Sequence, residues 1–319
     1  MDVTDASETA QSVVDEILGA VVGEREFMQT VMVGVLSRGH VLLEDVPGTG
    51  KTLTASSLAK ALGLSFSRIQ FTPDLLPADV TGTHIFNERD RTFEFSEGPV
   101  FANVVLADEI NRAPPKTQAA LLEAMQEQQV TVDGDTHPLP EPFFVIATQN
   151  PVEQEGTFEL PEAQVDRFQI KTSLGYPPED GEVELLRRRA GRDVGTPTVD
   201  TVLDADAVRE LRQVPETVHT DEDVLRYIAR LGRATRTHRR VAIGVSPRGI
   251  QKLFESARAR AVLDARSFVT PDDVKRVAEP ALAHRLVLEP EATIEGIDRA
   301  SIVRDVLEEV PVPTVDVDS

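Results

Sequence analysis

A lysine and a threonine at the end of a glycine-rich turn are the residues of this sequence best suited to bind a phosphate. Lys51 and Thr52 end the run HVLLEDVPGTGKT, which starts at His40 and continues into the helical pattern LTASSLAKAL. The backbone N–H groups of such a turn converge on an anion, and the N-terminus of the following helix points at the same place. The lysine ammonium would reach the β- and γ-phosphates of a nucleotide, and the threonine hydroxyl would hold Mg²⁺.

The turn departs from the strict pattern G-x-x-x-x-G-K-[ST] at its first position, where the chain has Asp45. The alternative interpretation is therefore a glycine-rich turn in an ordinary α/β protein. Its place between an apolar run and a helix favours nucleotide binding. The residues expected to contact the nucleotide are Asp45, Pro47, Gly48, Thr49, Gly50, Lys51, Thr52 and Leu53.

Two adjacent carboxylates follow a second apolar run. Asp108 and Glu109 come directly after residues 104–107, as expected for a buried parallel strand whose carboxyl end opens on a ligand crevice. Adjacent side chains of a strand diverge, so the two acids can do different work. Asp108 would bind Mg²⁺ through water, and Glu109 would polarise the water that attacks the γ-phosphate. Taken alone, such a pair is as often a solvated strand end as a functional pair of acids.

Two more places are candidates for the same site. Asn150 follows the apolar run 143–148, and its amide could hydrogen-bond the attacking water or the γ-phosphate. Val22 and Gly23 are candidates for the wall of an adenine slot, because a purine needs an apolar surface near its phosphates.

The elements that must hold these residues are strands alternating with helices. We expect helices over residues 24–37 and after Pro114 and Pro115, the latter with Leu121, Leu122 and Met125 as core residues. Strands are expected at 65–70, 104–108, 143–148 and 169–172, in addition to the run before the turn. This pattern is typical of an α/β domain.

Two hairpins interrupt the pattern. Residues 83–86 and 92–95 flank a polar turn and predict a hairpin, which is either ordinary elaboration or a working loop. The Asp133-Gly134 pair predicts a tight turn in a second hairpin.

The character of the sequence changes near residue 176. From residue 179 onward helical segments are separated by turns rich in Gly, Pro and Asp. Ser246-Pro247 and Thr270-Pro271 both predict helix starts, with a hydroxyl as N-cap and proline at the first helical position. We expect an N-terminal helical lead over residues 1–20, an α/β domain over 21–176, a helical domain over 177–310 and a disordered tail over 311–319.

Composition narrows the function. The chain of 319 residues has 54 acidic and 33 basic residues, a net charge of −21. An acidic surface repels phosphate backbones and argues against nucleic acid as the main partner. It is also what adaptation to molar salt would produce, which thermal melts in rising KCl would test. Without an apolar run long enough for a membrane span or a signal peptide, we expect a cytoplasmic protein.

Cysteine and histidine exclude other chemistries. The sequence has no cysteine, so disulfides, thiolate metal sites and thiol nucleophiles are ruled out. The six histidines show no paired spacing typical of a zinc site.

The blocks PGTGKT, DEINRAPPKTQAALLEAMQE, ATQNP and LPEAQVDRF, in this order, resemble the MoxR family of AAA+ ATPases, in the helix-2-insert clade. The resemblance extends from about Val21 to the C-terminal helices. It implies a P-loop core with a parallel five-stranded sheet and β-hairpin insertions, followed by a smaller all-α lid domain. The hairpin at 83–95 matches the family's helix-2 insert, and the one at 130–140 matches the hairpin before sensor 1.

The resemblance also implies roles for single residues. Lys51 and Thr52 would be Walker A, Asp108 and Glu109 Walker B, and Asn150 sensor 1. Arg167 is similar to the arginine finger that completes a neighbour's site, and Arg248 to sensor 2. Because any single arginine in a chain with 27 of them is by default a surface charge, these two assignments rest on the family pattern and not on spacing. Arg112 and Arg187–Arg189 are lower-ranked alternatives.

The resemblance further implies ATP hydrolysis with Mg²⁺ and assembly into a homo-oligomeric ring, usually a hexamer. Family members resemble chaperones that remodel protein clients, often with a separate von Willebrand A domain partner. The alternatives are a chelatase-type motor subunit for metal insertion, a DNA motor like the MCM helicases, and a nucleotide switch that barely hydrolyses. Glu109 argues against the switch.

Overall fold

The computed structural model of the chain describes residues 1–151, 157–158, 160–191, 195 and 197–313. Its centre is a parallel five-stranded sheet in the order β2-β5-β8-β1-β9. The strands are β1 (Val41–Glu44), β2 (Phe66–Gln70), β5 (Val104–Asp108), β8 (Phe144–Gln149) and β9 (Ile170–Thr172). The predicted α/β core with a parallel five-stranded sheet is confirmed.

Both faces of the three central strands β5, β8 and β1 are buried, and alternate residues of these strands enter different cores. Val41 and Leu43 of β1 join one core, with α1 (Val3–Ala20), α2 (Arg25–Leu36) and α3 (Lys51–Ala61). Leu42 joins the other core, which contains α5 (Pro115–Glu127). This alternation explains why the strands read as continuous apolar runs. Leu121, Leu122 and Met125 are buried as expected.

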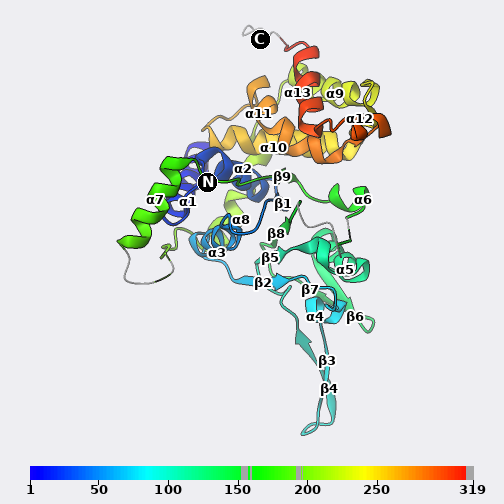
Figure 1. Ribbon diagram of the computed structural model, residues 1–319. Coiled ribbons are helices and arrows are strands. Elements are labelled where there is room, and N and C mark those ends of the chain that lie inside the picture. The colour runs from blue at the N-terminus through cyan, green and yellow to red at the C-terminus, as the bar shows by residue number, and fades with distance from the viewer. Residues whose placement is uncertain (152–156, 159, 192–194, 196, 314–319) are drawn as a thin grey trace.

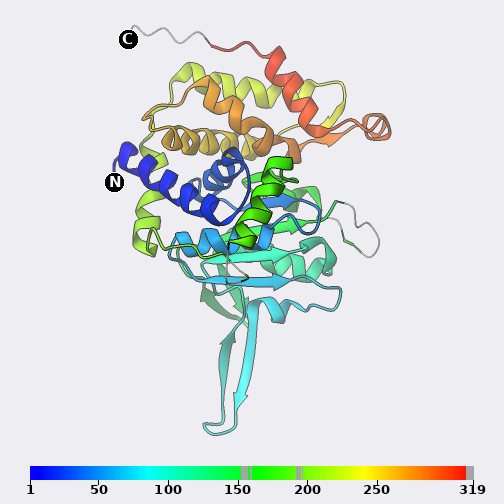
Figure 2. The ribbon, with the colours of Figure 1, turned by 60° about the vertical axis from the view of Figure 1, so that its left-hand side comes forward.

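The two predicted hairpins are present. β3 (Gly82–Asn87) and β4 (Thr92–Glu97) pair antiparallel and project from the body below the short helix α4 (Pro77–Thr81) (Figure 1; Figure 2). β6 (Gln129–Val132) and β7 (Asp135–Pro138) form the second hairpin. Asp133 and Gly134 both have positive φ, as the tight turn requires.

The C-terminal part is a helical lid, drawn from yellow to red in Figure 1. Its helices are α9 (Glu222–Thr237), α10 (Pro247–Leu263), α11 (Pro271–Leu282), α12 (Pro290–Ile294) and α13 (Arg299–Glu309). Ser246 and Thr270 cap α10 and α11 through their hydroxyls, as predicted. The lid also contains a short antiparallel pair, β10 (Val241–Ile243) and β11 (Val287–Leu288). We did not predict it, because strands of two or three residues leave no periodic signal.

α6 (Glu162–Val165) lies between β8 and β9, and α7 (Glu179–Ala190) and α8 (Ala205–Leu211) follow the last core strand in the described part of the chain. The side chain of Arg188 on α7 donates to Leu18 O and Gly19 O at the end of α1. Val202 N donates to Ala61 O at the end of α3. Residues after 177 therefore also pack on the core, and the boundary near residue 176 stays a prediction. Residues 314–319 of the expected tail lie outside the described residues.

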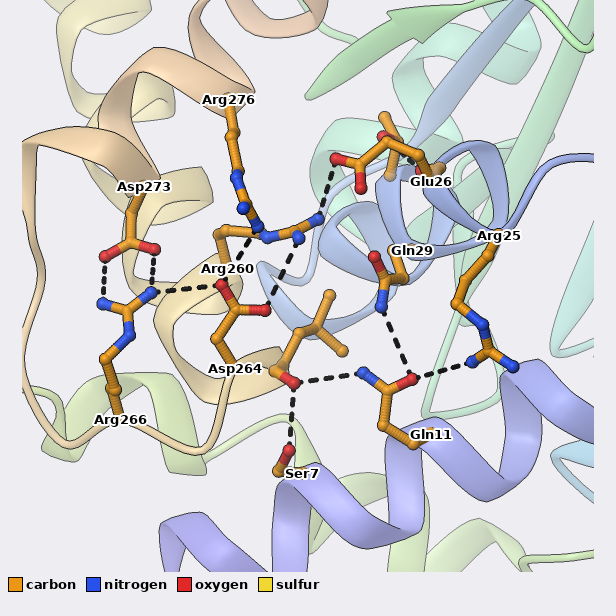
Figure 3. A network of polar contacts seen from close by, with 12 residues as sticks. Ser7, Gln11, Arg25, Glu26, Gln29, Arg260, Asp264, Arg266, Asp273 and Arg276 are labelled. Carbon is orange, nitrogen blue, oxygen red and sulfur yellow. Dashed lines mark hydrogen bonds and ion pairs between the residues drawn. The ribbon is translucent and has the colours of Figure 1, made fainter.

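A polar network ties the N-terminal helices to the lid (Figure 3). Arg260 on α10 is buried and donates to Glu26 on α2 at 2.9 Å. Ser7 and Gln11 on α1 both donate to the carbonyl of Leu263 at the end of α10. Among the described helices, none is both long and apolar enough to cross a membrane.

Candidate nucleotide-binding site

The glycine-rich turn lies between β1 and α3 and has the backbone of a phosphate loop. Gly48 and Gly50 have φ of +88° and +99°, and Gly50 is the N-cap of α3. A Cβ on Gly48 would meet nothing within 4 Å. The requirement for glycine at this position is therefore conformational rather than steric. The N–H groups at the start of α3 point out of this turn, where an anion is favoured.

Lys51 lies across the loop. Its Nζ donates to Asp45 O and to Val46 O, each at 2.8 Å. Thr52 is exposed at the second position of α3, and Leu53 packs against the core. Phosphate oxygens accept more strongly than these neutral carbonyls, so the amine is placed to move onto a bound triphosphate.

The carboxylate of Asp45 faces away from the loop. It accepts from Ser173 Oγ at 2.6 Å and from Leu174 N and Gly175 N at 2.8 Å each. Asp45 is 4% exposed. The residue predicted to contact the nucleotide thus turns its carbonyl to Lys51 while its side chain fixes the segment that follows β9.

Asp108 ends β5 with both carboxylate oxygens engaged. Oδ2 accepts from Arg68 Nε at 3.1 Å and Arg68 Nη2 at 2.6 Å, and Oδ1 accepts from Thr148 Oγ1 at 2.6 Å. Arg68 lies on β2 and Thr148 on β8, the two strands that flank β5. The carboxylate is therefore oriented from both sides.

Glu109 is held differently. It is a non-glycine residue in the left-handed conformation, with φ of 56°, which turns its side chain out of the strand's alternation and costs about 1 kcal/mol. Its N–H donates to Thr148 Oγ1 at 2.8 Å. Its Oε2 accepts from Gln70 Nε2 at 2.8 Å and Arg112 Nη1 at 3.1 Å.

Strand register brings the loop and the acid pair to the same edge of the sheet. β8 pairs with β1 on one side, with Glu44 opposite Gln149, and with β5 on the other, with Ala107 opposite Ala147. Asp45 N donates to Gln149 O at 3.1 Å. Because neighbouring strands lie about 4.8 Å apart, the ends of β1 and β5 are roughly 10 Å apart. The loop and the acid pair therefore lie at the same edge of the sheet, on the two strands that flank β8.

Asn150 follows β8 and is 6% exposed, between the loop strand and the acid strand. Val22 and Gly23 also lie near the loop, through Leu174. A Cβ on Gly23 would be 3.0 Å from Leu174 Cδ1, and one on Gly50 would be 3.9 Å from Leu174 Cδ2. The candidate adenine wall and the phosphate loop thus share one apolar neighbour.

The predicted arginines are not gathered at the phosphate loop. Arg167 follows α6 and donates to Leu122 O on α5 at 2.6 Å, and Arg248 is exposed at the start of α10. Of the alternatives, Arg112 contacts Glu109. Arg187 and Arg188 pair with Glu184 on their own helix α7.

A groove of about 970 Å³ lies beside the loop. Glu44 and Ser173 line it next to Asp45, and its opposite wall comes from α11 and α13 of the lid. Charges of both signs line the groove, including the pair Lys171–Glu44 at 2.8 Å. The reactive groups Lys51, Asp108 and Glu109 lie outside this lining.

The residues at the site fit Mg²⁺ together with phosphates. Thr52 offers a hydroxyl and Asp108 a carboxylate, which are oxygen ligands of the kind that Mg²⁺ prefers. Within the described parts of the chain, no group of three or more His, Cys, Asp or Glu side chains could hold a metal. A magnesium ion here would therefore need phosphate oxygens and water as its remaining ligands.

Arg68, Gln70 and Thr148 were missed as site residues by sequence reasoning. Arg68 and Gln70 are alternate residues of the strand beside β5, so they share a face. Two long polar side chains on one face of a strand that lies next to an acid-tipped strand were the signal that could have found them.

Comparisons with known proteins agree with this fold. Residues 40–170 match the model of the ATPase family associated with various cellular activities (AAA), and residues 233–306 match the AAA lid domain. The chain is 48% identical to the uncharacterized protein YeaC of Bacillus subtilis over 94% of its length and 93% of that protein. It is 41% identical to the chaperone MoxR1 of Mycobacterium tuberculosis, over 96% of its length and 83% of that protein.

Two further comparisons cover nearly the whole chain. The MoxR protein of Methylorubrum extorquens is 31% identical over 97% of both chains. A crystal structure of a candidate ATPase from Cytophaga hutchinsonii superposes with a TM-score of 0.90 at 42% identity, covering 98% of this chain and 97% of that one.

Proposed function

Because this chain belongs to the MoxR family of AAA+ ATPases, we propose that its ATP site is the edge of the sheet where the β1 loop and the β5 acid pair meet. The observation that carries the proposal is the shared register of β1, β8 and β5. It supports the proposal because it brings the Lys51 loop and the pair Asp108–Glu109 to the same edge of the sheet, on either side of β8.

Each group has a distinct role. The loop N–H groups and the Lys51 ammonium bind the β- and γ-phosphates, and Asn150 orients the γ-phosphate or the attacking water. Mg²⁺, which Thr52 and Asp108 would hold, neutralises phosphate charge when bound. Glu109 accepts a proton from the water as its oxygen bonds to the γ-phosphorus and the bond to the β-phosphate oxygen breaks. Val22 and Gly23 receive the adenine.

Hydrolysis requires Glu109 to be free to reach water. In this structure its carboxylate is held by Gln70 and Arg112. We infer that binding of the triphosphate releases it, because the carboxylate must then turn from these two donors to the attacking water.

The test of the ATP site is magnesium-dependent phosphate release by the purified chain, compared with Lys51→Ala and Thr52→Ala. We expect both variants to lose ATP binding and turnover together. Retained binding and turnover in Lys51→Ala would show that the loop is not the phosphate site.

We propose that the active form is a homo-oligomeric ring, specifically a hexamer, in which Arg167 completes the neighbouring subunit's site. Arg167 lies on the α5–α6 side of the subunit and not on its own phosphate loop, as a residue acting in trans requires. Arg248 is proposed as sensor 2, and its exposed position at the start of α10 is compatible with action on its own subunit's site or on the neighbour's. Analytical ultracentrifugation with and without Mg-ATP tests the assembly. Arg167→Ala subunits should turn over about 10³-fold more slowly and recover when mixed with Glu109→Gln subunits.

The work driven by hydrolysis is proposed to be remodelling of a protein client, with a von Willebrand A domain protein as a separate partner. The β3–β4 hairpin supports a protein contact, because its outer end exposes aromatic surface: Phe86 is 49% and Phe93 71% exposed. The inner end of the same face is covered, since His137 stacks on Phe95 at 3.7 Å. A double Phe86→Ser, Phe93→Ser variant should keep basal ATPase activity and lose ATP-dependent client binding.

A further inference from the structure

We propose that Arg285 of the lid is the positioning residue for Arg167. Through it, the lid would control where the Arg167 side chain of each subunit lies relative to the neighbouring subunit's site. The proposal rests on the proposed trans role of Arg167. Arg285 lies in the lid, 118 positions after Arg167, and it holds the backbone on both sides of Arg167.

Arg285 contacts both residues that flank Arg167, while its Nη1 donates to Ala281 O and contacts His284 Nε2 within the lid. Arg285 Nε lies 2.8 Å from Asp166 Oδ1, as an ion pair rather than a linear hydrogen bond. Arg285 Nη2 donates to Asp166 O at 3.2 Å and to Phe168 O at 2.5 Å. The neighbouring His284 contributes a further contact between Nε2 and Phe168 O, at 3.4 Å. One guanidinium therefore binds the carbonyls before and after Arg167.

These contacts leave Arg167 little freedom at its base. Phe168 is fully buried in the core that contains α5, and Arg167 N donates to Gln164 O at 3.1 Å. The Arg167 side chain in turn donates to Leu122 O. A change in the position of Arg285 must therefore move the segment that carries the Arg167 side chain.

Stability alone is a weak reason for this arrangement. The Arg285 side chain is 2% exposed, and burial, with a smaller effect of Arg248, lowers the pKa of its guanidinium to about 10, although Asp166 opposes the shift. Burying an ion pair gains little over packing an apolar side chain of similar size. A cation that binds three acceptors on one turn does, however, fix that turn's geometry.

Arg260 provides a matched control. It is also a buried lid arginine that reaches the core, and it pairs with Glu26 and Asp264 (Figure 3). These two partners lie on α2 and at the end of α10, away from residues 166–168. Loss of Arg260 and loss of Arg285 should therefore cost similar stability, while only the loss of Arg285 should affect the neighbour's site.

The experiment uses full-length Arg285→Met and Arg285→Lys, with Arg260→Met as the control. We expect Arg285→Met to bind ATP with wild-type affinity and to lower kcat by about 10²-fold, because a misplacement of about 1 Å can cost that much. The kcat of Arg285→Lys should lie between those of the wild type and Arg285→Met, since lysine keeps the charge but cannot bind both carbonyls as the planar guanidinium does. Arg260→Met should keep the wild-type kcat.

Mixed oligomers separate positioning from a folding defect. Arg285→Met subunits have an intact catalytic site of their own, and Glu109→Gln subunits carry an intact Arg167. Mixing the two should restore activity, whereas mixing Arg285→Met with Arg167→Ala should not. If Arg285→Met stays inactive with Glu109→Gln while Arg167→Ala is rescued, the positioning role is overturned. If Arg167→Ala is not rescued either, the trans role proposed for Arg167 fails instead.

Asp166→Asn tests the same contact from the other side, should Arg285→Met fail to fold. It keeps a side chain of the same size and removes the charge that faces Arg285. We expect kcat to fall less in Asp166→Asn than in Arg285→Met. Mixing with Glu109→Gln subunits should again restore activity. A wild-type kcat in both Asp166→Asn and Arg285→Lys would contradict the proposal.

Discussion

Thr148 Oγ1 donates a hydrogen bond of 2.6 Å to Asp108 Oδ1 and accepts one of 2.8 Å from Glu109 N. Thr148 is fully buried. A single hydroxyl on β8 thus orients the proposed magnesium ligand and the backbone of the proposed base.

Replacing Thr148 by valine keeps the shape and removes both hydrogen bonds. We expect kcat for ATP hydrolysis to fall about 10-fold or more, because a hydrogen bond to a charged group is worth about 1.5–3 kcal/mol. Steady-state phosphate release measures it. Thr131→Val, on the exposed hairpin, is the control and should not change kcat. A Thr148→Val enzyme with the wild-type rate would remove Thr148 from the site.

We predict that Arg68 competes with Mg²⁺ for the carboxylate of Asp108. The Arg68 side chain is 47% exposed and Asp108 accepts two of its N–H groups. Arg68→Gln should lower the Mg²⁺ concentration for half-maximal hydrolysis by about 2–5-fold, since an exposed ion pair is worth up to about 1 kcal/mol. A magnesium titration of ATPase activity, with Arg89→Gln at the hairpin tip as control, measures the shift. A higher magnesium requirement in Arg68→Gln would contradict the competition.

Asp45 is predicted to stabilise the chain and not to contact the nucleotide through its side chain. Asp45→Asn keeps the size but weakens three hydrogen bonds, and should lower the free energy of unfolding by about 1–3 kcal/mol. ATP affinity should change less than about 3-fold. Asp45→Gly restores the strict pattern and should be less stable still. A large loss of ATP affinity in Asp45→Asn at unchanged stability would place the carboxylate at the nucleotide.

These results show which parts of the site a sequence can reveal. Lys51, Thr52, Asp108 and Glu109 could be proposed from the sequence because their chemistry lies in contiguous residues beside an apolar run. Arg68 and Thr148 act through the neighbours that strand order gives them, and no local pattern carries that order. The partners of Asp45 lie 128 to 130 residues away.

The fold shows the same division. The core strands, both hairpins and the caps of α10 and α11 were predicted from periodicity, the Asp-Gly turn and the Ser-Pro and Thr-Pro starts. The β10–β11 pair and the packing of α7 on α1 depend on contacts between distant segments. The domain boundary and the catalytic roles remain predictions.

His40 gives the chain a specific pH dependence. It is buried, accepts from Val145 N at 3.0 Å and lies 3.0 Å from Met125 O. Burial lowers its pKa to about 4, against the Met125 contact that opposes the shift. Since an unfolded histidine has a pKa near 6.5, the unfolded chain binds more protons between the two values. The contribution of neutral His40 to the free energy of unfolding is therefore fully present above about pH 6.5 and is lost as the pH falls toward about 4.

Urea unfolding measures this effect. Between about pH 7 and about pH 5, His40 should account for about 2 kcal/mol of the fall in unfolding free energy. His40→Asn keeps an acceptor for Val145 N, should be less stable at neutral pH and should show a correspondingly smaller fall. An equal fall in both proteins would show that other groups, such as His284, whose pKa burial also lowers, carry the dependence.

The most direct test of the ATP site is Glu109→Gln under single-turnover conditions. The amide keeps the contact with Gln70 or Arg112 but cannot take a proton from water. We predict that this variant binds Mg-ATP as tightly as the wild type and cleaves it about 10²–10⁴-fold more slowly. Cleavage at the wild-type rate, with ATP bound, would contradict the assignment of Glu109 and with it the proposed site.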